Sequence, residues 1–133
     1  VLMPEDHVLA DEAYIDASAL VGHRVLLMGE GHCFRDQVLE ACPGLQQAIR
    51  EDYAQGHAVV EGSSLETLKH MVASGLGITV LPKSAADVAT YGEHSLAVRP
   101  FTDPVPRRTI ALAWRVSFPR HDAIDILADA LRS

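Results

Sequence analysis

The sequence predicts an α/β fold made of Rossmann-like βαβ units, and three observations support this prediction. Short apolar runs rich in β-branched residues occur at 25–28 (VLLM), 58–61 (AVVE) and 78–82 (ITVLP). Helical patterns separate these runs, so that strands and helices alternate over the first ~90 residues. A chain of 133 residues is also long enough for one domain with a modest core.

The first helix is expected over 34–41 (FRDQVLEA), directly after the strand at 25–28. The segment GEGH at 29–32 supplies the turn between them, and the composition of 34–41 favours helix. Pro43 and Gly44 should end this helix. Cys33 would therefore lie at a helix N-terminus, and Cys42 just beyond the C-terminus.

The second helix is expected after Glu61, where Ser63 and Glu66 fit a capping box. Gly75 is placed to end this helix. Four apolar residues share one of its faces: Leu65, Leu68, Met71 and Val72.

The last third of the chain is interpreted as β, β, α. A short helical piece at 84–89 leads to a strand pattern at 96–101, then to a long strand pattern at 107–116, and finally to a helix at 121–132. The final helix has one apolar face, formed by Ile124, Leu127, Ala128 and Leu131. These elements need something to pack against, so a domain boundary is expected near 83–106.

Charge and hydropathy exclude several classes of protein. Eighteen Asp and Glu outnumber eleven Lys and Arg, and the basic residues are scattered, so this chain by itself should not bind DNA. No apolar run reaches the ~18 residues of a membrane span, and the first residues lack the pattern of a signal peptide. We therefore expect a cytoplasmic protein without a membrane partner. No cofactor is indicated.

The two cysteines, Cys33 and Cys42, are too few for a disulfide scaffold. In a reducing compartment, paired thiols more often indicate metal or redox chemistry, although two unrelated packed thiols are an alternative. At a helix N-terminus, the exposed N–H groups and the helix dipole favour a thiolate at Cys33, and Arg35 and protonated His32 would act in the same direction. Such a thiolate could attack a peroxide, and Cys42 is the only thiol that could then form a disulfide with it.

Because a helix is expected between the cysteines, forming that disulfide requires a conformational change. Nine residues of helix span ~13 Å, whereas a disulfide needs Cα atoms within ~7 Å. Joining Cys33 to Cys42 must therefore unwind the helix. By the chain-entropy estimate, closing this small loop stabilises the chain by roughly 3 kcal/mol. The stability lost with the helix and its packing is of comparable size. Such a bond would suit a reversible switch.

Other interpretations of these residues remain open. A metal site formed by His32, Cys33, Cys42 and His57 is weakly supported, because the chain has no CxxC or HxxxH spacing among them; no metal is predicted.

Two further pairs of residues are candidates. Ser63 and Ser64 could bind an anion at their helix N-terminus, or simply cap it. Of Arg107 and Arg108, one should face inward, where an arginine usually has a partner.

The sequence resembles the second half of the regulatory region of LysR-type transcriptional regulators. Residues 1–28, with their PEDH start, and 64–82 (SLETLKHMVASGLGITVLP) carry the features common to that family. Residues 31–42 (GHCFRDQVLEAC) and 104–112 (PVPRRTIAL) are similar to the segments found in its hydrogen-peroxide-sensing members. These four segments are spread from residue 1 to residue 112, so the resemblance runs along nearly all of the chain.

The resemblance implies a role for each site residue. Cys33 falls on the peroxidatic cysteine and Cys42 on the resolving cysteine of the peroxide sensors. His32, Arg35 and Asp36 fall on the flanking residues of the redox motif, and Arg108 on an arginine that lies close to the reactive sulfur. A histidine precedes the strand matching 58–61 in the family, and His57 stands two positions away from that place.

The resemblance also implies a fold, an organisation and partners. The fold would be a periplasmic-binding-protein-like regulatory subdomain, with residues 1–90 forming the second regulatory subdomain and 91–133 returning to the first. The parent would be a dimer or tetramer that acts on promoter DNA and RNA polymerase, is reduced by glutaredoxin or thioredoxin, and is not an enzyme. The alternative is a sensor of the same architecture that binds a small anion at Ser63 and Ser64.

Overall fold

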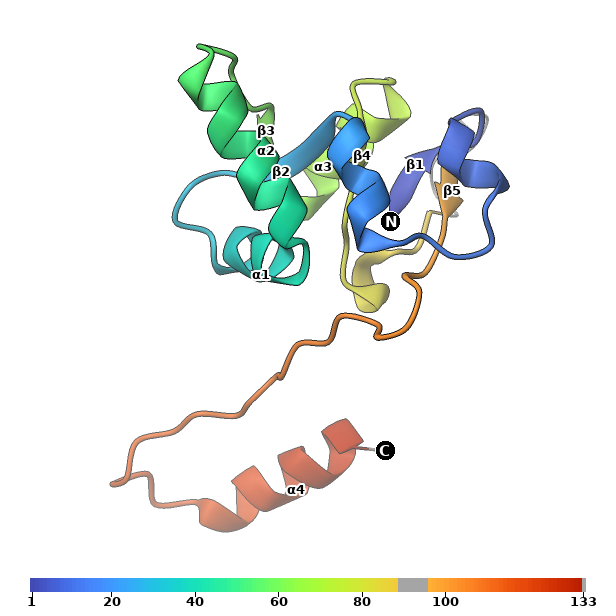
Figure 1. Ribbon diagram of the computed structural model, residues 1–133. Helices are drawn as coiled ribbons and strands as arrows, with labels where there is room; N and C mark the ends of the chain where they lie inside the picture. Colours follow the sequence, from blue (N-terminus) through green and yellow to red (C-terminus); the bar gives the residue numbers. More distant parts are fainter. Residues whose placement is uncertain (89–95, 133) are drawn as a thin grey trace.

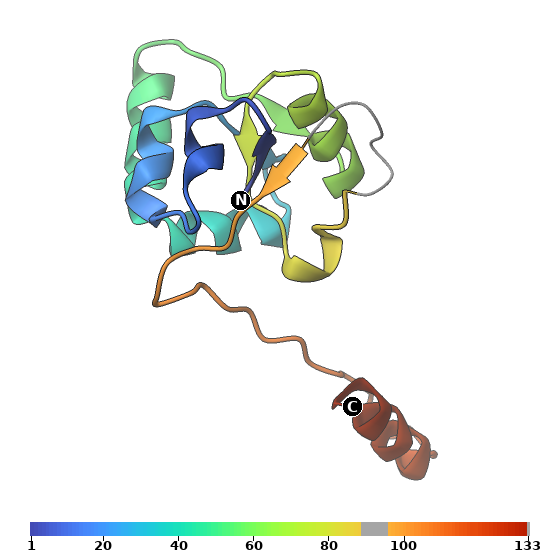
Figure 2. The same cartoon turned by 90° about the vertical axis from the view of Figure 1, so that its right-hand side faces the viewer.

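The computed structural model describes residues 1–88 and 96–132, and their strands form one mixed sheet of order β3-β2-β4-β1-β5 (Figures 1 and 2). β2 pairs in parallel with β3 and with β4, while β1 pairs antiparallel with β4 and with β5. The strands are β1 (Leu2–Pro4), β2 (Val25–Met28), β3 (Glu61–Gly62), β4 (Ile78–Thr79) and β5 (Leu96–Val98). The parallel trio β3-β2-β4 confirms the predicted βαβ units.

Helices cover both faces of this sheet. Figure 2 shows α2 with the two N-terminal 3-10 helices on one side and α3 on the other, while α1 lies along the lower end. The α-helices are α1 (Cys33–Ala41), α2 (Pro43–Ala54), α3 (Leu65–Ala73) and α4 (His121–Arg132). The 3-10 helices are η1 (Val8–Asp11), η2 (Ala17–Gly22) and η3 (Lys83–Ala85).

The core lies between the sheet and the helices that precede β5, and α4 contributes no buried residue to it. All four residues of β2 are buried, which explains why its sequence is continuously apolar rather than alternating. Leu68 and Val72 of α3 pack into the core, and Leu65 and Met71 lie partly buried at its edge, as the apolar face of this helix predicts. Every buried apolar residue among those described lies at or before Phe101.

The ends of α3 confirm one prediction and correct another. Ser64, not Ser63, is the N-cap: its hydroxyl accepts a hydrogen bond from the Thr67 N–H at 3.1 Å, so the capping box predicted for Ser63 and Glu66 is wrong by one residue. At the other end, Gly75 has a φ of +75°, and its N–H donates to the carbonyl of Val72. This left-handed residue ends the helix as predicted.

The strands after residue 57 are shorter than their apolar runs suggest. β3 is only Glu61–Gly62, because it is an edge strand that pairs with the end of the four-residue β2. β4 is limited to Ile78–Thr79. The helical piece predicted at 84–89 is a single 3-10 turn at Lys83–Ala85, and Ala89 lies outside the described residues.

The strand predicted at 107–116 is absent from the structure, and this prediction is wrong for the chain described. Residues 107–115 have no regular secondary structure and Val116 lies in a turn, because no strand among residues 1–88 and 96–132 lies beside them to form a ladder. Figure 1 shows this segment leaving the sheet and leading to α4, which stands apart from the body. The helix itself was predicted correctly over 121–132, but it has no buried residue.

The strand pattern at 96–101 is partly confirmed by β5. β5 pairs with β1, so it belongs to the same sheet as the first 88 residues. The division of the chain at residue 90 into two regulatory subdomains stays a prediction.

Candidate functional site

Helix α1 separates the two cysteines, which are both free thiols. Cys33 is the first residue of α1 and is exposed, whereas Cys42 caps its C-terminus and is only 1% exposed. The Cys42 N–H donates to the Val38 carbonyl at 3.0 Å, which completes the last turn. The nine residues of α1, Cys33 included, rise about 1.5 Å each before Cys42, so the thiols cannot form a disulfide in this conformation.

The two thiols differ in their surroundings. Burial raises the pKa of the Cys42 thiol. Cys42 is therefore held as a neutral thiol at neutral pH. Cys33 instead meets solvent at the end of the helix where backbone N–H groups lack partners within the helix.

His32 is the N-cap residue of α1. Its Nδ1 accepts a hydrogen bond from the Phe34 N–H at 3.2 Å. This bond satisfies one of the unpaired N–H groups of the first turn and fixes where the helix begins. The helix predicted from residue 34 thus begins one residue earlier, with Cys33 inside its first turn.

Arg35 faces the sheet rather than solvent. Its Nη1 donates to the Met28 carbonyl at 2.9 Å and to the Glu61 carboxylate at 2.6 Å, and its side chain is only 7% exposed. From the sequence we expected the positive charge of Arg35 to stabilise a thiolate at Cys33. In the structure the Arg35 guanidinium instead pairs with the carboxylate of Glu61. Asp36, also in the first turn of α1, is exposed.

Sequence reasoning missed Glu61 as a residue of this site. A signal was present, since the apolar run at 58–61 ends in a carboxylate and a buried arginine needs a partner. Nothing local, however, connects Glu61 to a helix 26 residues earlier.

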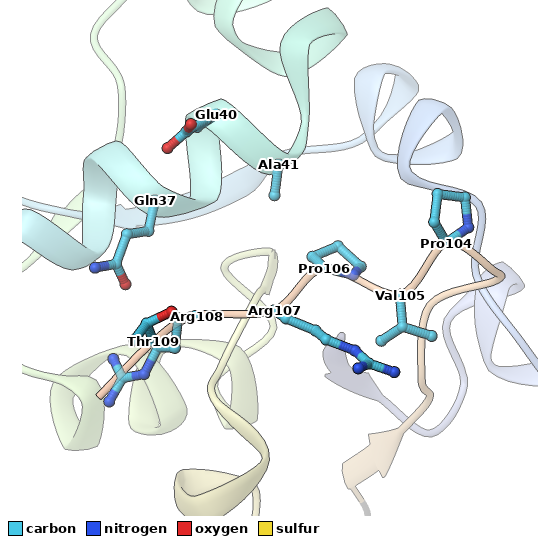
Figure 3. A pocket seen from close by; sticks show the side chains of 9 residues that line it. All are labelled: Gln37, Glu40, Ala41, Pro104, Val105, Pro106, Arg107, Arg108 and Thr109. Carbon is cyan, nitrogen blue, oxygen red and sulfur yellow. The ribbon is translucent and has the colours of Figure 1, made fainter. Parts of the chain in front are cut away.

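The segment 104–109, which carries Arg107 and Arg108, runs alongside α1. Between them lies an open groove of about 530 Å³, lined by Gln37, Glu40, Ala41 and residues 104–109 (Figure 3). Gln37 points toward the segment, and the side chains of Arg107 and Arg108 point in different directions. The Arg108 guanidinium carbon lies 5.7 Å from the centroid of the Phe34 ring. Both arginines are nevertheless exposed, and 107–116 forms no strand, so the prediction that one of them faces inward is wrong for the residues described.

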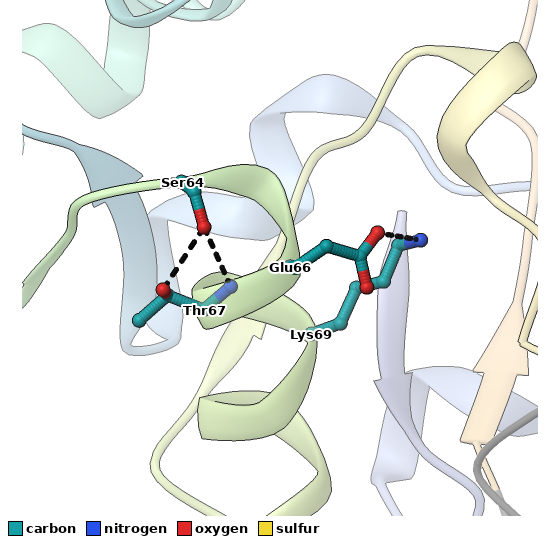
Figure 4. Close-up of polar contacts among 4 residues, drawn as sticks. All are labelled: Ser64, Glu66, Thr67 and Lys69. Carbon is teal, nitrogen blue, oxygen red and sulfur yellow. Dashed lines mark hydrogen bonds and ion pairs between the residues drawn. The ribbon is translucent and has the colours of Figure 1, made fainter.

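Three other candidate residues lie away from α1. His57 follows the C-terminal end of α2 and faces Asp52, with 3.6 Å between Nδ1 and Oδ1. The hydroxyls of Ser63 and Ser64 lie 3.4 and 3.0 Å from the Thr67 hydroxyl. Figure 4 shows Ser64 and Thr67 facing each other at the start of α3, an arrangement that a plain cap explains.

Within residues 1–88 and 96–132, no three or more His, Cys, Asp or Glu side chains come together in a way that could hold a metal ion. Within the same described residues, none of the helices combines the length and the apolar character needed to cross a membrane.

The sequence matches the family described as the LysR substrate binding domain over residues 1–133. The chain belongs to this family. The structure of the reduced form of the OxyR regulatory domain from Pseudomonas aeruginosa is 55% identical with a TM-score of 0.81; the match covers 98% of this chain and 59% of that one. A reduced form of OxyR from N. meningitidis is 35% identical with a TM-score of 0.80, covering 97% of this chain and 58% of that one.

The curated relatives that the chain matches are named as gene regulators. A probable hydrogen peroxide-inducible genes activator of Streptomyces viridosporus is 39% identical over 99% of this chain and 40% of the relative. The DNA-binding transcriptional dual regulator OxyR of Escherichia coli K12 is 35% identical over 97% of this chain and 40% of the relative. The chain thus spans about 40% of the length of these relatives.

Proposed function

We propose that this chain is the peroxide-sensing part of the regulatory region of a LysR-type transcription activator that controls antioxidant genes. The observation that supports this best is the placement of the two thiols: Cys33 is exposed at the N-terminus of α1, and Cys42 is buried at the C-terminus of the same helix. Relatives named hydrogen peroxide-inducible genes activators support the same signal.

The proposed chemistry has two steps. The Cys33 thiolate attacks one oxygen of hydrogen peroxide, the O–O bond breaks, and Cys33 becomes a sulfenic acid while hydroxide leaves and is protonated to water. The Cys42 thiol then loses its proton and attacks the Cys33 sulfur, which releases a second water and forms the disulfide. Two thiols are oxidised, and one peroxide is reduced to two waters.

Charge near Cys33 favours the first step. The N-terminal N–H groups of α1 stabilise negative charge on the sulfur, and the Arg108 guanidinium lies against Phe34, the next residue. A cation there would also stabilise the charge that moves onto the leaving oxygen. His32 contributes by defining the first turn, while Asp36, which is negative, has the opposite charge effect.

The second step requires α1 to unwind, which turns the chemistry into a change of shape. Unwinding removes the Cys42–Val38 hydrogen bond and exposes a residue that is now buried. It also pulls on the Arg35–Glu61 ion pair, which joins α1 to β3. A regulator can transmit such a change of shape to a neighbouring domain. The thiol is oxidised once for each signal and does not turn over peroxide continuously as an enzyme would.

Several parts of this function concern the whole regulator. The parent protein would act as a dimer or tetramer on promoter DNA and with RNA polymerase, and a glutaredoxin or thioredoxin would restore the thiols. A reducing cytoplasm fits a disulfide that must be reversible.

Single substitutions of the two cysteines test the proposal. With Cys33→Ser, hydrogen peroxide should leave the mass and the remaining thiol unchanged. With Cys42→Ala, Cys33 should stop at a sulfenic acid that a dimedone reagent traps. If Cys33→Ser leaves the oxidation of the chain intact, the roles are wrong, and an anionic ligand at Ser63 and Ser64 becomes the function to test.

A further inference from the structure

We infer that Phe34 is a positioning residue that holds the Arg108 guanidinium beside Cys33 through a cation–π contact. The inference rests on the proposed function, and it adds a residue whose aromatic ring, rather than its apolar bulk alone, is required. Arg108 and Phe34 come from segments 74 residues apart, so neither local sequence nor the helix itself brings them together.

The geometry of the pair supports this assignment. The guanidinium carbon is 5.7 Å from the ring centroid, within the ~6 Å at which a cation over an aromatic face is attracted. Phe34 is 7% exposed, so its ring is fixed in the core and offers a rigid platform. Arg108 is exposed, and none of the salt bridges between described residues involves it. The ring is therefore the contact that localises this charge.

The position of Phe34 links the contact to the reactive thiol. Phe34 is the second residue of α1, directly after Cys33, and its N–H is held by the His32 cap. A cation held on this ring lies against the second residue of α1, one residue after Cys33, at the helix end where unpaired backbone N–H groups also favour negative charge. Without the ring, the flexible arginine would spend more time in solvent, where its effect on Cys33 is screened.

The test measures the thiolate at Cys33 without peroxide. In the 133-residue chain with Cys42→Ala, Cys33 is the only thiol, and its alkylation rate by neutral iodoacetamide at pH 7 follows its thiolate population. Phe34→Leu keeps an apolar side chain but removes the ring, and should slow alkylation by about two- to five-fold at low salt, the range expected for an exposed cation–π contact. Phe34→Tyr should restore the rate.

Arg108 and its neighbour provide matched controls. Arg108→Ala should slow alkylation at least as much as Phe34→Leu, and Arg107→Ala, which removes the same charge from the adjacent residue, should change it much less. Phe34→Leu should have no further effect once Arg108 is alanine. All these differences should shrink in 1 M salt, which packing effects would not do.

Three results would overturn the inference: equal slowing by Phe34→Leu and Phe34→Tyr, the same slowing by Phe34→Leu with Arg108 already removed, or equal effects of Arg107→Ala and Arg108→Ala. Circular dichroism checks that each variant keeps its helices. If Phe34→Leu unfolds, the alkylation rates of Arg107→Ala, Arg108→Ala and Phe34→Tyr still test the inference. If alkylation behaves as expected but peroxide yields no sulfenic acid, the positioning role stands and the proposed function fails.

Discussion

Arg35 in the first turn of α1 donates a hydrogen bond to the carboxylate of Glu61 in β3 at 2.6 Å. The bond ties the helix that separates the two thiols to the edge of the sheet. Because the arginine is buried and the carboxylate is about one-third exposed, the pair is shielded from solvent on one side only. It stabilises α1 in the form with free thiols, and a disulfide that unwinds α1 must weaken it.

Glu61→Gln should therefore shift the redox equilibrium. Losing a charged partner of Arg35 should lower the free energy of unfolding of the reduced chain by about 1–2 kcal/mol. Because only the reduced form loses this stabilisation, the disulfide becomes harder to reduce, and the reduction potential should become about 20–40 mV more negative. Redox titration against glutathione, with thiols counted by mass, measures the shift.

Glu66→Gln is the matched control for this experiment. It removes a carboxylate that pairs with the buried amine of Lys69 at 2.7 Å in α3, as Figure 4 shows, far from the thiols in sequence. The variant should lower stability but leave the potential unchanged. An unchanged potential in Glu61→Gln would mean that the first turn of α1 survives in the disulfide form.

Substitution of the two serines before α3 separates capping from ligand binding. Ser64→Ala should lower the free energy of unfolding by about 1 kcal/mol, because Ser64 accepts the Thr67 N–H, whereas Ser63→Ala should cost less than about 0.5 kcal/mol. Urea unfolding measures both. If an anion such as sulfate stabilises the chain and either variant abolishes that effect, the serines bind a ligand and the alternative function gains support.

The stability of the chain should fall in mild acid through His7. Its Nδ1 accepts the Leu9 N–H, and burial, together with the charge of His23, lowers the pKa of His7, while Asp6 acts in the opposite direction. Since the unfolded state then binds the proton more readily, stability is complete above pH ~6.5 and is lost as pH falls below it. Melting temperatures at pH 7.5 and 5.5 measure the loss.

His7→Asn is the control for that loss, because asparagine can cap η1 but does not titrate. Its melting temperature should fall less between the two pH values than that of the unchanged chain. If the melting temperatures of His7→Asn and of the unchanged chain fall equally between the two pH values, groups other than His7 cause the acid sensitivity.

The segment after Phe101 should make the isolated chain associate. Three apolar side chains there are 75%, 48% and 97% exposed, namely Ile110, Trp114 and Val116. An extended apolar segment without a partner favours pairing with a second copy. Sedimentation at increasing concentration should show dimers or larger species, while a chain ending at residue 101, which keeps every buried apolar residue described, should remain monomeric. A full chain that is monomeric at high concentration would contradict this.

The local parts of this structure could be predicted from the sequence, and the parts that depend on distant partners could not. The turn at 29–32 and the composition of 34–41 were enough to place Cys33 at the start of a helix and Cys42 at its end. The N-cap of α3 was misplaced by one residue, because two adjacent serines offer the same chemistry and only backbone geometry chooses between them.

The errors at greater distance have a different cause. Alternation at 107–116 predicts a strand, but a strand exists only where a neighbour supplies hydrogen bonds, and the described residues supply none. In the same way, the partner of Arg35 is set by how β3 packs beside β2, which no local pattern encodes. The residue types of the site were predictable, whereas their pairing was a tertiary property.

The most direct test of the central claim is the response of the reduced chain to stoichiometric hydrogen peroxide, followed by intact mass, thiol count and far-ultraviolet circular dichroism on the same sample. We expect a loss of two hydrogens, no remaining thiol, and a drop in helix signal from α1 that dithiothreitol reverses. A disulfide formed with the helix signal unchanged, or oxidation that stops at a sulfinic acid with no disulfide, would contradict it.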